Sequence, residues 1–198
     1  MEEFTIKYGN IKPIDSADGE GVRVSLFVSG CNFKCKGCHN EEAWDFNYGK
    51  PFTNETLDYI DECLSKDYIS GFSVLGGEPL DPKNVNDVIK IITHVHNKFP
   101  NKTIWLWTGN TLENIIKKEL IDYHVLREMI DVLVDGPFIL EQRDLTLKFR
   151  GSRNQRVIDV KKTFDATREA MLNETCTRLN TIQTNKGFMP LRIVLYCD

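Results

Sequence analysis

Hydrophobic and polar positions alternate along the chain in two patterns, short apolar runs and longer amphipathic segments. The apolar runs predict buried strands, which we expect over 22–28, 72–75, 103–108, 129–134, 155–160 and 191–197. Apolar residues three and four positions apart predict helices, which we expect over 54–65, 82–99, from 111 onward and over 164–172. Strands separated by helices of about ten or more residues indicate βαβ units, so the pattern predicts an α/β fold with a mostly parallel sheet.

Two polar pairs predict where helices begin. Asp81 followed by Pro82 is typical of a cap and a first helical residue, so we expect a helix from 82. Asn110 with Glu113 matches a capping box for the next helix. Residues 175–190 are polar and weakly periodic, which favours a loop.

Small and polar residues follow each of the four central predicted strands. The strands end in SGC at 29–31, GGE at 76–78, TG at 108–109 and DG at 135–136. In parallel α/β folds, ligands bind at the carboxyl ends of the strands. We therefore expect these four strand ends to meet at one ligand-binding face.

Composition limits the class of protein. The 198 residues are 41% hydrophobic and 27% charged, with a net charge of −4, which suits one globular domain and argues against a general nucleic-acid surface. No apolar run approaches the ~20 residues of a membrane-spanning helix. The acidic start, MEEFTIKYGN, lacks the apolar region of a signal peptide. The expected location is the cytoplasm, with no membrane or nucleic-acid partner.

The six cysteines therefore indicate metal or redox chemistry rather than a disulfide framework. Cys31, Cys35 and Cys38 lie within eight residues, CNFKCKGC, in a loop rich in Lys, Gly and Asn. Three thiolates at this spacing can face one ion or one cluster.

Four interpretations of the three cysteines compete. Free structural cysteines normally lie on apolar faces, unlike this loop. Structural zinc needs four ligands, and His39, the nearest candidate, is adjacent to Cys38. The CKGCH match to a covalent haem site requires export. A 4Fe–4S cluster with three thiolates leaves one iron open for a ligand, which is the arrangement of a catalytic metal site.

Five segments, in order, carry a resemblance. They are DGEGVRVSLFVSGCNFKCKGCHN, SVLGGEPLDPKNV, IWLWTG, DVLVDGPF and FRGSRNQRVIDV. Together they resemble the radical S-adenosylmethionine (SAM) superfamily, and within it the activating proteins of anaerobic ribonucleoside-triphosphate reductase. The resemblance covers about 7–160 and then fades, so we expect a radical SAM core over 1–160. We expect residues 161–198 to form a C-terminal extension packed on the same domain.

The resemblance implies a partial (β/α) barrel with the metal site at its open end. Cys31, Cys35 and Cys38 then hold a 4Fe–4S cluster, whose open iron binds SAM and whose electron yields a 5′-deoxyadenosyl radical. The implied substrate is a glycine Cα of the reductase large subunit, and the implied electron donor is a flavodoxin-type protein. Five further residues are expected to contact SAM, namely Gly37, His39, Gly76, Gly77 and Glu78.

Two other functions remain open at this point. One is activation of a different glycyl radical enzyme of the formate-lyase type. The other is a non-catalytic zinc or iron–sulfur module. The family's usual aromatic residue before the third cysteine is Gly37 here, so the adenine contact is expected to differ in detail.

Several other residues have two interpretations each. The basic run from Arg143 to Arg156 is either a solvated loop or a contact with SAM or the reductase. Asp135 either caps a turn or helix or meets the partner's glycine loop. Trp105 and Trp107 share one side of their strand, and the core is the favoured location for both. His94 and His96 are expected to be structural.

Overall fold

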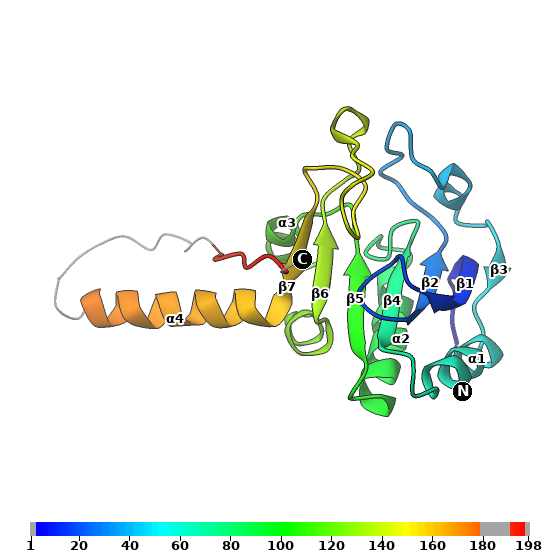
Figure 1. Ribbon diagram of the computed structural model, residues 1–198, viewed down its shortest axis with the longest axis horizontal. Helices are drawn as coiled ribbons and strands as arrows, with labels where there is room; N and C mark the ends of the chain where they lie inside the picture. Colours follow the sequence, from blue (N-terminus) through cyan, green and yellow to red (C-terminus); the bar gives the residue numbers. More distant parts are fainter. Residues whose placement is uncertain (1–2, 179–190, 197–198) are drawn as a thin grey trace.

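The computed structural model describes residues 3–178 and 191–196, with side chains given up to residue 169 and again from 191. The part of the predicted loop at 179–190 lies outside the described residues, as do Cys197 and the side chain of Cys176. Seven strands form one sheet in the order β3-β1-β2-β4-β5-β6-β7 (Figure 1). Their bounds are β1 Lys7–Asp15, β2 Arg23–Val28, β3 Lys50–Pro51, β4 Gly71–Gly76, β5 Thr103–Trp107, β6 Val132–Asp135 and β7 Arg156–Asp159.

The sheet is parallel in its centre and antiparallel at its margins. Strands β2, β4, β5 and β6 run parallel in consecutive order. Strands β1 and β3 on one side and β7 on the other run antiparallel to their neighbours. The predicted α/β fold is confirmed, and the mixed sheet is consistent with a partial barrel.

Helices α2 and α3 follow the parallel strands β4 and β5, whereas α1 follows β3 and α4 follows β7. The bounds of these helices are α1 Asn54–Leu64, α2 Val85–Lys98, α3 Leu112–Lys117 and α4 Val160–Arg178, with short turns of helix at Glu41–Trp44, Val125–Met129 and Leu140–Gln142. Helix α4 begins directly after β7 and extends away from the sheet (Figure 1).

Alternation along β5 divides the apolar residues into two clusters. Ile104 and Leu106 belong to the main core, which includes the buried residues of α1 and α2. Trp105 lies on the other face of the sheet, where it is 1% exposed and packs edge-on against Phe149 and Tyr196 at ring distances of 5.0 and 5.1 Å. The predicted core location of Trp105 is therefore confirmed.

The predicted start of α2 is wrong by one turn. The helix begins at Val85, because Asp81 forms a separate turn before it. The Asp81 carboxylate accepts a hydrogen bond from the Lys83 amide at 3.0 Å, and its carbonyl accepts from the Asn84 and Val85 amides at 2.8 and 2.9 Å. A side chain that bonds its own following backbone competes with helix formation.

Four other boundaries differ from the prediction. Helix α4 spans Val160–Arg178, so it begins before and ends after the predicted 164–172 and includes 175–178 of the predicted loop. Helix α3 is capped by Thr111, whose hydroxyl accepts from the Asn114 amide, and not by Asn110. Strand β6 starts at Val132, because Val125–Met129 forms a π-helical turn. Residues 191–196 form a single bridge, Ile158 to Leu195, rather than a strand.

Strand β1 was not predicted, and its burial explains why. Eight of its nine residues are half-buried or exposed, so it lacks an apolar run. No helix in the described part of the chain is long and apolar enough to cross a membrane.

Candidate metal centre

The ends of the central strands are joined by hydrogen bonds at one end of the sheet. The Glu78 amide donates to the Gly30 carbonyl at 2.8 Å, which connects β4 to the loop after β2. The Gly109 amide donates to the Glu78 carboxylate at 2.7 Å, and the Thr108 amide donates to the Val134 carbonyl at 3.0 Å. These bonds connect β4 to β5 and β5 to β6. The predicted convergence of the strand ends is confirmed.

The cysteine loop, residues 31–40, leaves this end of the sheet directly after β2. Cys31 is buried, whereas Cys35 and Cys38 are half-buried. The Cys31 amide donates to the Trp44 carbonyl at 3.2 Å, and the Cys38 amide donates to the Cys35 carbonyl at 3.1 Å. The structure thus brings the three cysteines together in one folded loop at the predicted place.

Burial raises the pKa of the Cys31 and Cys35 thiols above its usual range, and the nearby Glu78 carboxylate raises it further. Without metal, both thiols hold their protons at neutral pH. Since metal ions and clusters bind thiolates, loading this loop must release protons.

The donor set fits a cluster better than a single ion. Among the residues that the structure describes, no three His, Cys, Asp or Glu side chains converge on one metal position. Structural zinc needs four donors at about 2.0–2.3 Å from one point. A 4Fe–4S cluster binds each thiolate through a different iron, so its ligands need not converge on one point.

Gly76 and Gly77 allow two strand ends to approach closely. A Cβ atom on Gly77 would lie 2.4 Å from the Gly30 oxygen, and one on Gly76 would lie 2.6 Å from the Val28 nitrogen. Gly76 also has a φ of +116°, a conformation that side chains disfavour. The Gly77 amide donates to the Val28 carbonyl at 2.7 Å. The paired glycines therefore position the cysteine loop as well as forming a turn.

The Glu78 carboxylate is 2% exposed and bound by protein donors. One oxygen accepts from the Leu80 amide at 2.9 Å and the Thr108 hydroxyl at 2.7 Å, and the other accepts from the Gly109 amide. Burial raises the pKa of Glu78 to about 7, although these three donors act in the opposite direction. The side chain connects the ends of β4 and β5.

Two residues that the sequence analysis did not single out hold the cysteine loop. Asn84 is 2% exposed, and its amide donates to the carbonyls of Ser29 at 3.0 Å, Gly30 at 3.3 Å and Glu78 at 2.9 Å. The Asn32 side chain donates to the Asp81 carboxylate at 2.7 Å. Both Asp81 and Asn84 belong to the segment PLDPKN that follows GGE.

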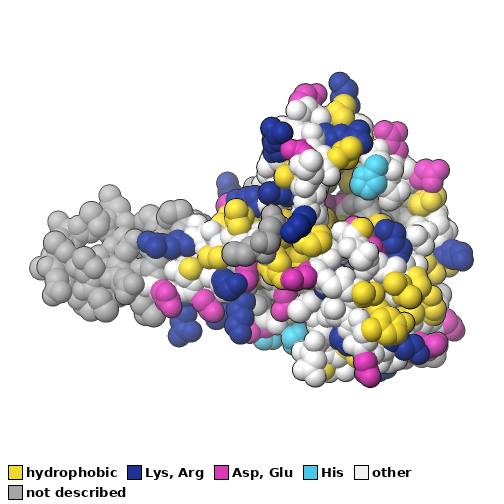
Figure 2. All heavy atoms as spheres, viewed as in Figure 1, with side chains coloured by type: hydrophobic (Ala, Val, Ile, Leu, Met, Phe, Trp, Pro, Cys, Tyr) yellow, Lys and Arg dark blue, Asp and Glu magenta, His cyan; other side chains and the backbone are white. Residues whose placement is uncertain are grey.

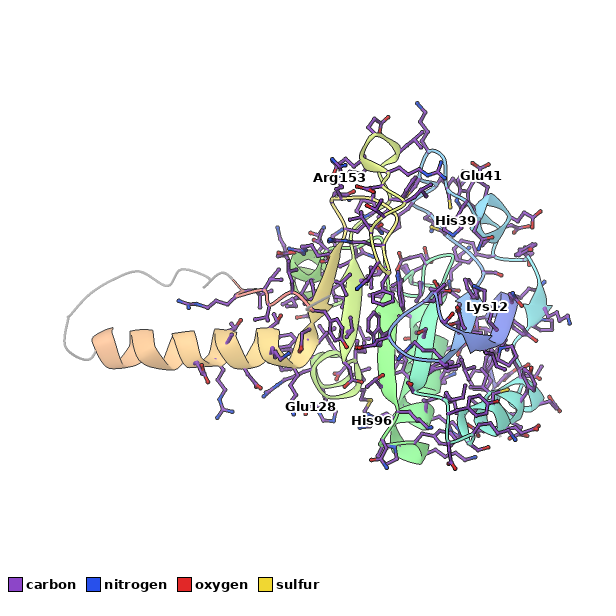
Figure 3. All side chains as sticks on the ribbon, viewed as in Figure 1. Lys12, His39, Glu41, His96, Glu128 and Arg153 are labelled. Carbon is purple, nitrogen blue, oxygen red and sulfur yellow. The ribbon has the colours of Figure 1, made fainter. Side chains whose placement is uncertain are left out.

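A second loop, residues 137–155, lies beside the cysteine loop beyond the strand ends (Figure 1). A Cβ atom on Gly37 would lie 2.9 Å from the Leu140 side chain, and the Phe138 amide hydrogen-bonds the Cys35 sulfur. Figure 3 shows exposed His39 at this end of the molecule, together with Glu41 and Arg153.

The basic run divides into two groups. Arg150 donates to the Gln155 carbonyl at 2.7 Å, and Arg153 pairs with Asp144 at 3.0 Å, so both stabilise the 137–155 loop. Arg143 and Lys148 are exposed, and neither has an ion-pair partner among the described residues.

Two roles were considered for Asp135, a cap of a turn or helix and a contact with the partner's glycine loop. The structure supports the cap. Asp135 is fully buried and accepts from the Leu112 amide at 2.7 Å, which caps α3. Its carboxylate also pairs with Arg156, whose Nε lies 2.9 Å away. His94 is structural as predicted, because its ring nitrogen lies 2.9 Å from the Asp61 carboxylate.

Comparison with known proteins adds the family. Residues 17–158 match the family described as a 4Fe-4S single cluster domain. The chain is similar to the anaerobic ribonucleoside-triphosphate reductase-activating protein of Vibrio cholerae, with 42% identity over 152 residues that cover 76% of this chain and 96% of that protein. The same-named protein of Escherichia coli (strain K12) is 40% identical over 156 residues, covering 77% and 97%. That of Enterobacteria phage T4 is 40% identical over 154 residues, covering 77% and 93%.

Proposed function

This chain belongs to the anaerobic ribonucleoside-triphosphate reductase-activating proteins, a radical SAM-type family with a 4Fe–4S cluster domain, and we propose that Cys31, Cys35 and Cys38 hold that cluster. Its function is to activate the anaerobic reductase. We further propose that SAM is the co-substrate and that the product is a glycyl radical on the reductase large subunit.

The observation that carries this proposal is the attachment of the cysteine loop to the GGE turn. Gly77 and Glu78 donate backbone hydrogen bonds to Val28 and Gly30, on either side of buried Ser29. The Ser29 hydroxyl has no hydrogen-bond partner in the part of the chain described, so a polar ligand group at this strand end fits it. Three thiolates leave one iron of the cluster for such a ligand.

A cluster held by Cys31, Cys35 and Cys38 would supply the one-electron reduction that cleaves SAM into methionine and a 5′-deoxyadenosyl radical. The protein binds and orients the reactants and excludes water. We assign the backbone at Gly76 and Gly77 to the amino-acid part of SAM, and Gly37 and His39 to its nucleoside. Glu78 belongs to the same site, where its buried carboxylate fixes the ends of β4 and β5 around the ligand.

The alternatives are less well supported. A zinc module needs a fourth ligand and a single point of convergence, which the described side chains do not provide. Activation of a formate-lyase-type enzyme is not favoured, because the three relatives are all named for the anaerobic ribonucleoside-triphosphate reductase.

Three finer statements belong to the proposal. The electron donor is a flavodoxin-type protein, and the protein acts in the cytoplasm. Residues 1–160 form the radical SAM core, and 161–198 form an extension on the same domain. The match to the cluster family ends at 158, two residues before α4, which supports this boundary.

The test measures iron and acid-labile sulfide per chain after reconstitution without oxygen. We expect about four of each, together with reductive formation of 5′-deoxyadenosine from SAM and an organic radical signal on added reductase. Cys31→Ala, Cys35→Ala and Cys38→Ala should each abolish all three. Cys63→Ala is the matched control, because Cys63 is half-buried in α1, outside the cysteine loop.

Two results would contradict the assignment. One is 5′-deoxyadenosine formation by Cys35→Ala at the rate of the unmodified chain. The other is about one zinc per chain with no sulfide, which indicates a structural ion.

A further inference from the structure

Leu145 is the most exposed large hydrophobic residue in the described part of the chain, at 84%. It lies in the 137–155 loop, whose shape is fixed by hydrogen bonds on both sides of it. The Asp144 carboxylate accepts from the Thr146 amide at 3.0 Å and pairs with Arg153, while the Asp144 amide donates to the Gly151 carbonyl at 3.2 Å. A rigid loop therefore presents an apolar side chain to water, which lowers the entropic cost of binding a partner there.

The two loops at this end are basic in a chain that is acidic as a whole. The complete chain has 25 Lys and Arg against 29 Asp and Glu. The cysteine loop contains Lys34 and Lys36 and no acidic residue, and the segment 137–153 contains four basic and two acidic residues. Figure 2 shows Lys and Arg side chains at this end, with hydrophobic atoms and some Asp and Glu side chains among them. The local charge therefore attracts an acidic surface.

We define the basic rim as Phe33, Lys34, Lys36, Arg143, Leu145 and Lys148. The rim is formed by two loops that touch, because the Leu140 side chain contacts the backbone at Gly37. Phe33 is 40% exposed, and its ring lies 2.8 Å from the position that a Cβ on Gly109 would take. The rim thus borders both the cysteines and the end of β5.

We propose that the basic rim docks the reductase large subunit, with Leu145 entering an apolar depression and Arg143 and Lys148 pairing with acidic groups around it. This inference rests on the proposed function. Hydrogen transfer requires the reacting atoms to approach within about 3–3.5 Å, so the polypeptide that carries the glycine must sit against this rim. Arg143 and Lys148 have no partner within the described chain and stay available for it.

The test uses the reconstituted holoprotein, with dithionite as the reductant. The measured quantity is the reductase concentration that gives half-maximal radical formation. It is compared between the unmodified chain, Leu145→Ser and the double variant Arg143→Glu/Lys148→Glu. We expect each variant to raise that concentration about tenfold or more. For the unmodified chain the concentration should rise with ionic strength, whereas the charge-reversed pair should lose this dependence. The rate of 5′-deoxyadenosine formation without reductase should not change.

Controls are available at the opposite end of the sheet. Ile14→Ser removes a hydrophobic residue that is 65% exposed near the end of β1. Lys66→Glu/Lys161→Glu reverses two exposed charges, one after α1 and one at the start of α4. Both controls should leave the half-maximal reductase concentration unchanged.

Each contrary outcome is distinct. Unchanged reductase binding by both rim variants overturns the docking role. A defect seen only with a flavodoxin-type protein, and absent with dithionite, assigns the rim to the electron donor instead. A loss of 5′-deoxyadenosine formation without reductase assigns these residues to SAM. If the unmodified chain cleaves no SAM, the proposed function itself fails.

Discussion

Asn84 satisfies three backbone carbonyls on two different strand ends with a single buried side chain. Leu has the same branched heavy-atom skeleton but donates no hydrogen bond. Asn84→Leu should therefore leave buried carbonyls unpaired, at a cost of about 1–3 kcal/mol, and loosen the cysteine loop. We expect a lower melting temperature and fewer than about four irons per chain after reconstitution.

Asn97→Leu is the control for this prediction, since Asn97 lies on the same helix and is exposed. It should change neither the melting temperature nor the iron content. Full iron content in Asn84→Leu would show that the loop does not depend on this amide.

Asp18 is the residue with the clearest expected pH dependence. Burial and the neighbouring Asp15 carboxylate raise the pKa of Asp18 to about 6. Burial also disfavours the Asp15 anion, but hydrogen bonds from Asp18 and the Ala17 amide outweigh it and lower the pKa of Asp15 to about 2. Lys12 lies 3.2 Å from Asp18 and 3.4 Å from Asp15. The folded protein therefore favours a protonated Asp18 beside an ionised Asp15.

The sign of the effect follows from proton binding. Between pH 3.8 and about 6, folded Asp18 binds a proton more tightly than the unfolded chain does, so stability falls as pH rises through this range. Asn resembles the protonated acid. Asp18→Asn should raise the free energy of unfolding by about 1–2 kcal/mol at pH 7 and leave it unchanged near pH 4. Urea unfolding of the cluster-free chain at both pH values tests this, and an equal effect at the two values would contradict it.

Residues whose type and spacing are specific to one chemistry could be predicted from the sequence as site residues. Residues that only support the site through hydrogen bonds could not. Three cysteines at CNFKCKGC spacing indicate a metal site because few other roles need three thiols in a polar loop. Asn84 has no such signature, since an amide in PLDPKN is equally typical of a turn. Its partners Ser29 and Gly30 are more than fifty residues away, and only the sheet brings them together.

Among the secondary-structure elements, β6, α3 and β7 depend on one carboxylate. Asp135 is fully buried at the end of β6, caps the Leu112 amide of α3 and pairs with Arg156 of β7. Arg156 also pairs with Glu113, which is half-exposed. The Arg156 guanidinium therefore has two carboxylate partners, Asp135 and Glu113, which differ mainly in burial.

We expect Asp135→Asn to destabilise the fold by about 2–3 kcal/mol, because it leaves Arg156 without its buried counter-charge. Glu113→Gln should cost less than about 1 kcal/mol, because exposed pairs are screened by water. Chemical denaturation of both variants at neutral pH measures the difference. Equal losses would show that burial does not set the strength of this pair.

Element types followed from periodicity, whereas several boundaries did not. Strands β2, β4 and β5 each lie between two neighbouring strands, and most of their residues are buried. Their apolar runs therefore predict strands clearly. Strand β1 lies near the edge and is only partly covered, so an alternation signal is weak there. The start of α2 moved because Asp81 bonds both its own turn and Asn32 of the cysteine loop.

On the scale of the whole molecule, the C-terminal segment completes the second face of the sheet. The Tyr196 amide donates to the Val157 carbonyl at 2.8 Å, and the Asp159 amide donates to the Val194 carbonyl at 3.0 Å. The Tyr196 ring packs on Trp105, and its hydroxyl donates to Glu20 in the loop between β1 and β2. Two sequence-distant parts of the chain thus meet over Trp105.

Deletion of residues 191–198 should therefore expose Trp105 and lower the melting temperature. We expect a red shift of the tryptophan fluorescence and a loss of about 2–4 kcal/mol, comparable to removal of a large aromatic residue from a core. Cluster content and SAM cleavage should persist, because the cysteine loop lies at the other end of β2. Loss of the cluster in this variant would place the segment within the catalytic core. Tyr196→Ala separates the contribution of the ring from that of the backbone bonds.

The anchoring of the cysteine loop has a consequence for survival in air. The backbone at Gly30 and Cys31 is bonded to Ala43, Trp44 and Glu78, and Asn32 is bonded to Asp81, so these bonds use protein groups only. If the cysteine loop holds the cluster as proposed, loss of the cluster to oxygen should therefore leave the flanks of the loop in place. Little chain entropy has to be given up when iron and sulfide return. We accordingly expect an oxidised molecule to be repaired by cluster resupply and thiol reduction, without a round of unfolding or new synthesis.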